Sequence, residues 1–243
     1  MDAPLEYIQN LSFKAQVIRT QRSKSIVIKI IDGGVYIHVP LDTARSEIEY
    51  LLDKRTSWIE KNLRFHQLKP KLVQKKFING EYFSCLGREY LLKVSSGNYQ
   101  PFTLVDKNLV ATLPGGDSNP HIVRRAIVQW YKHNALEILQ QRTLFYAKRL
   151  EVRPYSIGIK NYKARWGCCS AQGEIIFNWK IIIAPEFVCD YIVVHELCHL
   201  KHFNHSPRFW NLVAKILPEY KTSIAWLKFN ANLLNISPPL LLP

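Results

Sequence analysis

Two histidines that flank a glutamate are the residues of this 243-residue chain with the clearest chemical meaning. The segment 195–205 reads HELCHLKHFNH, in which His195 and His199 lie four residues apart and Glu196 follows the first of them. On a helix, residues four apart share one face, so both imidazoles can bind the same metal ion. A glutamate in this position lies beside the ion and can accept a proton from the attacking water, as in H-E-x-x-H zinc hydrolases. The motif therefore predicts a Zn²⁺ centre with Glu196 as general base.

The residues before the motif indicate that its helix is buried. Val188, Ile192, His195 and His199 follow one another at helical spacing, and Pro185 is a residue type favoured in the first turn of a helix. A buried imidazole needs a partner for its ring nitrogens. Two histidines at ligand spacing on a buried face therefore fit a metal site better than a solvated helix surface.

A catalytic zinc ion usually has three protein ligands, and His205 is the favoured third one. It can reach the ion only if the helix ends between His199 and His205. Asn204 suits the left-handed conformation that stops a helix, and Ser206-Pro207 reads as the start of a new one. This break would fold His205 back towards the first two histidines.

Two other residues are alternatives for the third ligand. Glu219 follows His199 by twenty residues, a spacing at which other zinc peptidases supply a glutamate. His202 lies on the same helical stripe, but on a straight helix it would be about 10 Å along the axis from His195.

The net charge is +14 and is spread over the chain. Residues 1–115 contain 17 basic and 11 acidic residues, which gives +6, and residues 116–243 contain 16 and 8, which gives +8. The charge favours an anionic partner such as a nucleotide, a nucleic acid or an acidic peptide, but it does not form a basic nucleic-acid-binding tail.

Composition also bears on the compartment. No apolar run reaches the roughly 18 residues that a membrane span needs, and the opening MDAPLEYIQNLSFK lacks the apolar stretch of a signal peptide. Five cysteines without a disulfide-rich pattern fit a reducing, cytoplasmic setting. The adjacent pair Cys168-Cys169 lacks C-x-x-C spacing and is expected to consist of small, half-buried residues.

The pattern of elements predicts an α+β fold that begins with a β-rich part. We expect strands at 24–31 and 35–39 around an Asp32-Gly33-Gly34 turn, a helix at about 44–66, more strands from 77 to 94 and a hairpin at 102–113. The lysine-rich run from Lys69 to Lys76 is expected to be an exposed linker. The segment 114–117, PGGD, is the expected domain boundary, so that a β-rich N-terminal region spans 1–115.

The expected second domain, residues 116–243, is mainly helical and of the zincin-like metallohydrolase kind. A long helix is predicted from Asn119-Pro120 to Leu150, followed by short strands at 155–160 and 174–178, the metal-binding helix, a helix from Ser206 and a last helical piece at 221–230. The apolar tail 231–243 is expected to pack on the body of the protein. The sequence contains no internal repeat.

Two residues are candidates for substrate binding. Arg165 lies in the segment KARWGCCSAQG between the two short strands, where it is expected either to anchor the substrate or stabilise an oxyanion, or equally to form a structural salt bridge. Residues 175–178 are expected to form an edge strand that pairs with an extended peptide, with Asn178 ending that strand near the metal.

Several stretches that together cover nearly the whole chain point to one family: RSKSIVIKI, the helix around Trp58, INGEYFSCLGREYLL, ARWGCCS, IIFNWKIIIAP, DYIVVHELCHLKHFNHSPRFW and LPEYKTSIAWL. In these stretches the chain resembles the YgjP-like metallopeptidases, also described as predicted metal-dependent hydrolases. The metal site is also similar to that of SprT-like peptidases. One departure is visible, because Cys168 stands where the family usually has the serine of R-W-G-S-C.

This resemblance implies a zinc-dependent hydrolase with His195, His199 and His205 as ligands and Glu196 as base. Peptide cleavage is the leading expectation. A nucleoside triphosphate pyrophosphatase at the same metal site is the alternative, since some relatives carry that assignment and the basic charge fits it. A non-catalytic zinc-containing nucleic-acid-binding module is less favoured, because a structural zinc site usually has four protein ligands.

Overall fold

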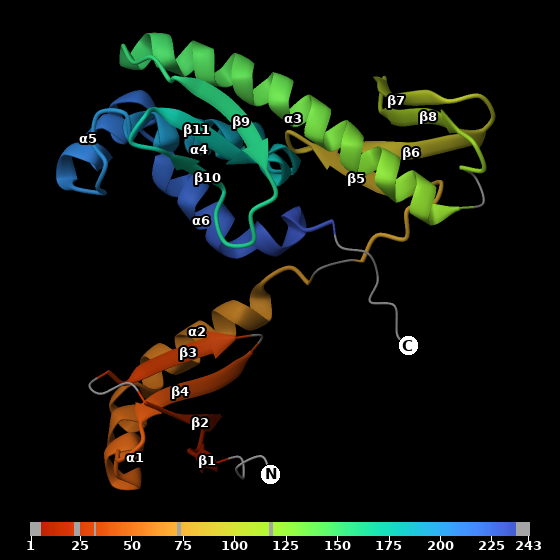
Figure 1. Cartoon of the computed structure of the whole chain (residues 1–243). Helices are drawn as coiled ribbons and strands as arrows, with labels where there is room; N and C mark the ends of the chain where they lie inside the picture. Colours follow the sequence, from red (N-terminus) through yellow and green to blue (C-terminus); the bar gives the residue numbers. More distant parts are fainter. Residues whose placement is uncertain (1–5, 22–24, 32, 72–73, 117–118, 237–243) are drawn as a thin grey trace. The chain divides into compact units, whose positions relative to one another are not determined.

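The protein is an α+β protein with three separate sheets (Figure 1). The computed structural model describes residues 6–21, 25–31, 33–71, 74–116 and 119–236. They divide into two compact units, Met1–Lys69 and Pro70–Pro243. Among the described helices, none combines the length and apolar character that crossing a membrane requires.

The first unit is a four-stranded sheet followed by two helices. Its elements are β1 (Glu6–Gln9), β2 (Lys14–Thr20), β3 (Val27–Ile31), β4 (Gly34–Pro40), α1 (Arg45–Lys54) and α2 (Thr56–Leu68), and the strand order is β1-β2-β4-β3. The predicted hairpin around Gly33 is confirmed by the antiparallel pairing of β3 with β4, while Lys24 and Asp32 lie outside the described residues. The single predicted helix at 44–66 is in fact two helices, which meet at Arg55.

Alternate residues of β4 form the centre of this unit's core. Val35, Ile37 and Val39 are buried, as the period-two pattern of a half-buried strand requires. They belong to one apolar cluster with Ile48 of α1 and Ile59 of α2. The first unit therefore has a hydrophobic core of its own.

The second unit begins with another four-stranded sheet. Its strands are β5 (Tyr82–Cys85), β6 (Arg88–Ser96), β7 (Gln100–Val105) and β8 (Asn108–Leu113), in the order β5-β6-β8-β7. As in the first unit, the outer strands pair antiparallel with their neighbours and the two central strands run parallel. The two sheets thus share one topology, although the sequence has no recognisable repeat.

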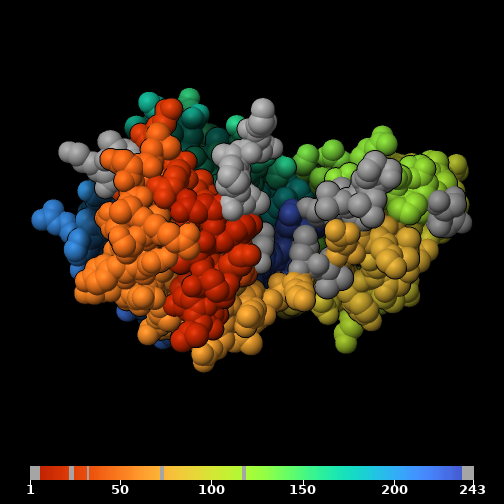
Figure 2. Space-filling model, turned by 90° about the horizontal axis from the view of Figure 1, so that it is seen from below, coloured from red at the N-terminus to blue at the C-terminus, as the bar shows by residue number. Residues whose placement is uncertain are grey.

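Helix α3 (Pro120–Leu150) connects this sheet with the rest of the second unit. The Asn119 side chain accepts hydrogen bonds from the backbone N–H groups of His121 and Ile122, and Pro120 occupies the first turn, so the predicted start is confirmed. Along its length the helix contacts β7, β9 and α4 (Figure 1). In the space-filling view the gold-to-yellow strands and the lime-green start of α3 form one continuous surface (Figure 2).

The remaining elements build the region of the H-E-x-x-H motif. A three-stranded sheet contains β9 (Ser156–Lys160), β10 (Gly167–Cys169) and β11 (Glu174–Asn178) in the order β10-β11-β9. It is followed by the 3-10 helix η1 (Trp179–Ile183), the helices α4 (Glu186–Cys198), α5 (Pro207–Ile216) and α6 (Tyr220–Asn230), and the 3-10 helix η2 (Ala231–Leu234). Strand β11 is therefore central, and the expectation that residues 175–178 form an edge strand is wrong, because β10 within the predicted loop pairs with its other side.

The compact units divide at Lys69/Pro70 and not at the expected 115/116 boundary. Strands β5–β8 and the helices after them share a single core, in which Leu92 and Leu109 belong to the same cluster as Ile127 and Val188. The division falls at the lysine-rich run that the sequence predicts to be a linker. The expected boundary segment 114–117 instead joins β8 to α3 within one unit, and its Asp117 lies outside the described residues.

The apolar tail begins on the core of the second unit. Leu234 of η2 is buried in that core, which agrees with the expected packing of the tail. Residues 237–243 lie outside the described part of the chain.

Candidate metal centre and active site

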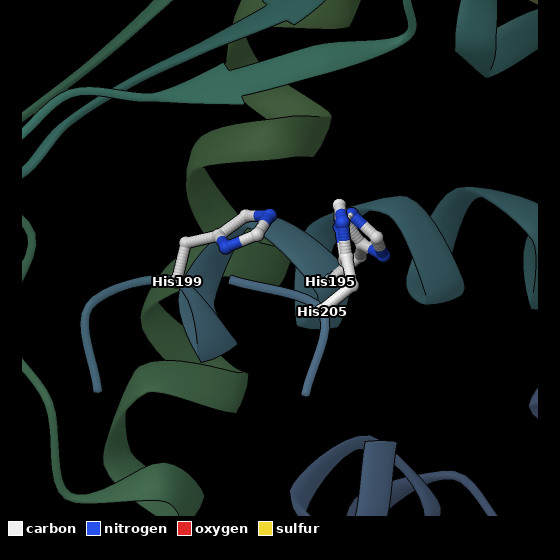
Figure 3. A group of neighbouring side chains, drawn as sticks. All are labelled: His195, His199 and His205. Atoms are coloured by element: carbon white, nitrogen blue, oxygen red, sulfur yellow. Dashed lines mark hydrogen bonds between the residues drawn. The ribbon is translucent and has the colours of Figure 1, made fainter. Parts of the chain in front are cut away.

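Helix α4 and the loop after it bring three imidazoles together. His195 lies in the last turn of α4 and His199 is its C-cap residue, while His205 lies just before α5. Their potential ligand atoms all lie within 4.8 Å of one another. Figure 3 shows the three rings turned towards a common space at the end of α4. Among the described residues, His202 and Glu219 do not join this group.

The chain turns back towards α4 earlier than the sequence indicates. The helix ends at Cys198, where the backbone N–H groups of Lys201 and His202 both bond to the Cys198 carbonyl oxygen. Asn204 does not have the left-handed conformation that was expected of it. Ser206 and Pro207 start α5 as predicted, and this places His205 against His195, with their Nε2 atoms 3.0 Å apart.

Hydrogen bonds orient two of the three rings. Nδ1 of His199 lies 3.1 Å from the carbonyl oxygen of His202, so it donates there and leaves Nε2 for a metal. Nδ1 of His195 lies 3.3 Å from the hydroxyl of Tyr191, one helical turn earlier. Tyr191 is not among the site residues that the sequence predicted, although its i−4 position relative to His195 is a readable signal.

Aromatic side chains also pack around the histidine rings. The ring centroid of Phe209 lies 4.7–5.0 Å from those of all three imidazoles. Trp210 stacks on His205, and Tyr220 stacks on Trp210. These contacts hold the imidazoles in place without occupying their nitrogen atoms.

The surroundings of His195 and His199 favour their neutral forms. Burial lowers the pKa of His195 to about 3, with further contributions from His199 and His205, and burial also lowers the pKa of His199. Neutral imidazole is the form that binds metal ions. Nitrogen atoms bound tetrahedrally to zinc at about 2.05 Å are roughly 3.3 Å apart, close to the separation of His195 and His205. The three imidazoles are therefore a donor set that fits a divalent metal ion.

Glu196 is buried beside this centre. Its side chain is 5% exposed, and burial raises its pKa to about 7, against an opposing effect of Arg165. Gly167 of β10 adjoins the carboxylate so closely that a Cβ at position 167 would lie 2.6 Å from Glu196 Oε1. Nothing in the sequence around Gly167 indicated this contact.

Arg165 and Asn178 occupy different environments. Arg165 is exposed, its guanidinium lies over the ring of Tyr162, and it is near enough to influence Glu196. Asn178 is only 2% exposed, and its side-chain N–H groups donate to the carbonyl oxygens of Tyr162 and Arg165. The Asn178 amide therefore fastens the segment that carries Arg165.

The cysteine pair lies on β10. Cys168 Sγ and the hydroxyl of Tyr162 are 3.0 Å apart, and this hydrogen bond is the main cause that raises the pKa of Tyr162 to about 12. Both cysteines are half-buried, as expected, and all five cysteines of the chain are free thiols.

A buried H-E-x-x-H helix with a third histidine folded back onto it defines the class of metal-dependent hydrolases. Residues 24–230 match the family described as "YgjP-like, metallopeptidase domain", and the chain belongs to this family. A solved structure, the metallopeptidase zymogen abylysin of Pyrococcus abyssi, is 24% identical over 38% of this chain and 97% of its own, with a TM-score of 0.34. The chain matches none of the curated proteins with which it was compared.

Proposed function

We propose that the protein is a zinc-dependent peptidase in which His195, His199 and His205 hold the metal and Glu196 is the general base. The observation that carries this proposal is the convergence of three imidazoles, with the buried Glu196 directly after the first of them in α4. Three protein ligands, one of them exposed, leave room for water and substrate, whereas a structural zinc site is usually closed by a fourth ligand.

The metal, when bound, would supply Lewis acidity that polarises the scissile carbonyl and lowers the pKa of the attacking water. Glu196 takes a proton from that water on a carboxylate oxygen and delivers it to the leaving amine nitrogen. Burial raises the pKa of the Glu196 carboxyl, so this side chain holds a proton more readily than an exposed glutamate before releasing it to the leaving group. Tyr191 and the His202 carbonyl keep the ligand rings in the required orientation.

The proposed substrate is a peptide in extended conformation. Strand β10 is at the edge of its sheet, pairs with β11 alone among the described strands, and begins at Gly167 next to Glu196. An extended peptide can add to such an edge through main-chain hydrogen bonds. Arg165, exposed at the same end, would anchor the peptide or stabilise the oxyanion, and Asn178 would position Arg165 without contacting the substrate.

The proposal is tested with the zinc-loaded protein and three variants on a mixture of unstructured peptides and nucleoside triphosphates. Glu196→Gln should keep its zinc and lose about 100–10,000-fold in peptide turnover, the range for a general base. His205→Ala should lose zinc, whereas the matched control His202→Ala should retain it, because His202 is outside the ligand group.

Product analysis by mass spectrometry separates the outcomes. Peptide fragments that disappear in Glu196→Gln support the proposal. Release of pyrophosphate that disappears in the same variant would replace it by a nucleotide hydrolase. Full zinc content in His205→Ala would contradict the ligand set.

A further inference from the structure

The space next to Glu196 is available only because residue 167 has no side chain. A Cβ built on Gly167 would lie 2.6 Å from Oε1, 2.7 Å from Cγ and 2.8 Å from Cδ of Glu196. Carbon atoms that are not bonded do not approach this closely. The carboxyl end of Glu196 thus occupies the volume in which any other residue at position 167 would have its side chain.

The backbone gives no other reason for glycine at this position. Gly173, in the turn between β10 and β11, has φ +85, a conformation that favours glycine. Gly167 does not have a positive φ, so an L-residue could adopt its backbone without strain. Contact with Glu196 is therefore the constraint on residue 167.

Strand β10 is held where it is and cannot easily move aside. Gly167 pairs with Phe177 of β11, which is fully buried. On the preceding segment, the backbone N–H of Asn178 donates to the Trp166 carbonyl at 2.7 Å, and the Asn178 side chain donates to two further carbonyls of that segment. The main chain of Glu196 is held in α4, so the Glu196 side chain is the part of this contact that can move most easily.

We propose that Gly167 is a positioning residue. Because it has no side chain, the carboxylate of Glu196 can occupy a place beside the metal centre that a Cβ at position 167 would block. A side chain at position 167 would displace the carboxylate from its present position and leave the three histidines in place. The packing relation stands by itself, and its effect on catalysis rests on the proposed role of Glu196 as general base.

The first experiment compares Gly167→Ala with Gly158→Ala in the zinc-loaded protein. Gly158 lies on β9 of the same sheet, and a Cβ there would meet nothing within 4 Å. Gly167→Ala should keep its zinc, measured by elemental analysis, and lose peptide turnover at least about 100-fold, approaching Glu196→Gln. Gly158→Ala should retain both. Full turnover in Gly167→Ala, or loss of zinc together with turnover, would overturn the proposal.

The second experiment needs no substrate and uses the thermal midpoint Tm of the metal-free protein. Gly167→Ala should lower Tm by a few degrees in the wild type and in Glu196→Gln, whose amide fills the same volume. In Glu196→Ala the obstructing group is absent, so the same change should leave Tm unchanged or raise it. If Gly167→Ala alone does not fold, the double variant Gly167→Ala/Glu196→Ala should fold.

An equal fall of Tm in all three backgrounds would overturn the proposal whether or not the protein cleaves peptides. Conversely, a fall confined to backgrounds with a long side chain at position 196 supports it even if no peptide is cleaved. In that case only the proposed function fails.

Discussion

The two four-stranded sheets have the same strand order and the same pattern of pairing but different roles in the protein. In both, the fourth strand is central and every second residue is buried, as in Val35, Ile37 and Val39 of β4 and in Leu109, Ala111 and Leu113 of β8. The first sheet shares its core with the helices that follow it, α1 and α2. The second shares its core with α3 and with α4, the helix that carries His195.

Further contacts connect the β5–β8 region with α3 and with the segment before α4. The backbone N–H of Leu86 donates to the Ile182 carbonyl at 2.6 Å, and the Tyr131 hydroxyl of α3 donates to the Ser84 carbonyl at 2.7 Å. Strand pairing therefore does not determine the boundary of a unit. The boundary depends on which apolar surfaces are buried together.

Truncation of equivalent core residues should give the largest contrast between the two sheets. Ile37→Ala and Leu109→Ala each remove a fully buried aliphatic side chain and should lower the free energy of unfolding by about 2–5 kcal/mol. Hydrogen exchange should increase within residues 6–69 for Ile37→Ala, and within residues 74–236 for Leu109→Ala. If either variant raised exchange in both units equally, the separate cores would not be independent.

Metal removal should affect only the unit that contains the histidines. A ligand at 100 times its Kd stabilises the native state by about 2.7 kcal/mol, so chelation should lower the unfolding temperature of residues 70–243 by the corresponding amount. The first unit should unfold at the same temperature with and without chelator. A shift of both transitions would show that metal binding is coupled to the first unit.

Loss of the Tyr191 hydroxyl should weaken zinc binding. Tyr191→Phe removes the hydrogen bond to His195 Nδ1 and keeps the aromatic packing, so zinc affinity should fall about 10–100-fold, as is typical for such supporting residues. Titration with a competing chelator measures the change. Tyr155→Phe, at an exposed tyrosine, is the matched control and should leave the affinity unchanged. An unchanged Kd for zinc in Tyr191→Phe would mean that the Tyr191 hydroxyl does not support metal binding.

The contact of β5–β8 with the start of α4 can be tested through two glycines. Gly87 (φ +77) would place a Cβ 3.0 Å from the backbone Cα of Pro185, whereas Gly80 (φ +89) would place it in open space. Backbone strain should lower the free energy of unfolding by about 1 kcal/mol or more in both alanine variants, and the decrease should be larger for Gly87→Ala than for Gly80→Ala. Equal losses by chemical denaturation would mean that the Pro185 contact adds nothing.

The smallest of the expected effects is a loss of stability of the second unit at acid pH. Arg142 of α3 donates to Glu186 at 2.5 Å and also to Asp190, and it lowers the pKa of Glu186 from its ordinary value of 4.5. The ionised carboxylate therefore stabilises the fold above about pH 4.5, and this stabilisation is lost as the pH falls through the lowered value. Since Glu186 is mostly exposed, the effect is small.

Glu186→Gln should accordingly flatten the fall of Tm below pH 4.5. Glu174→Gln, at an exposed position of β11, should leave that fall as it is in the wild type. If Tm fell with pH in the same way for Glu186→Gln and the wild type, this ion pair would not contribute to the stability of the second unit.

Local geometry explains what could be predicted about the metal centre. The i, i+4 relation of His195 and His199 and the extent of α3 from Asn119 to Leu150 follow from helical periodicity and from capping residues that are neighbours in the chain. A helix break is a local signal too, and after the break His205 lies with His195 and His199. Its role as the third metal ligand stays a prediction.

Patterns within short stretches thus predict most helices, most strands, the α+β class and the family of this protein. They do not predict that α1 and α2 are separate helices, that β10 is an edge strand, that Gly167 lies against Glu196, or that the units divide at Lys69/Pro70. The last three of these depend on contacts between residues far apart in the chain. Spacing along the sequence does not encode such contacts, since they arise only when separate apolar faces are buried against one another.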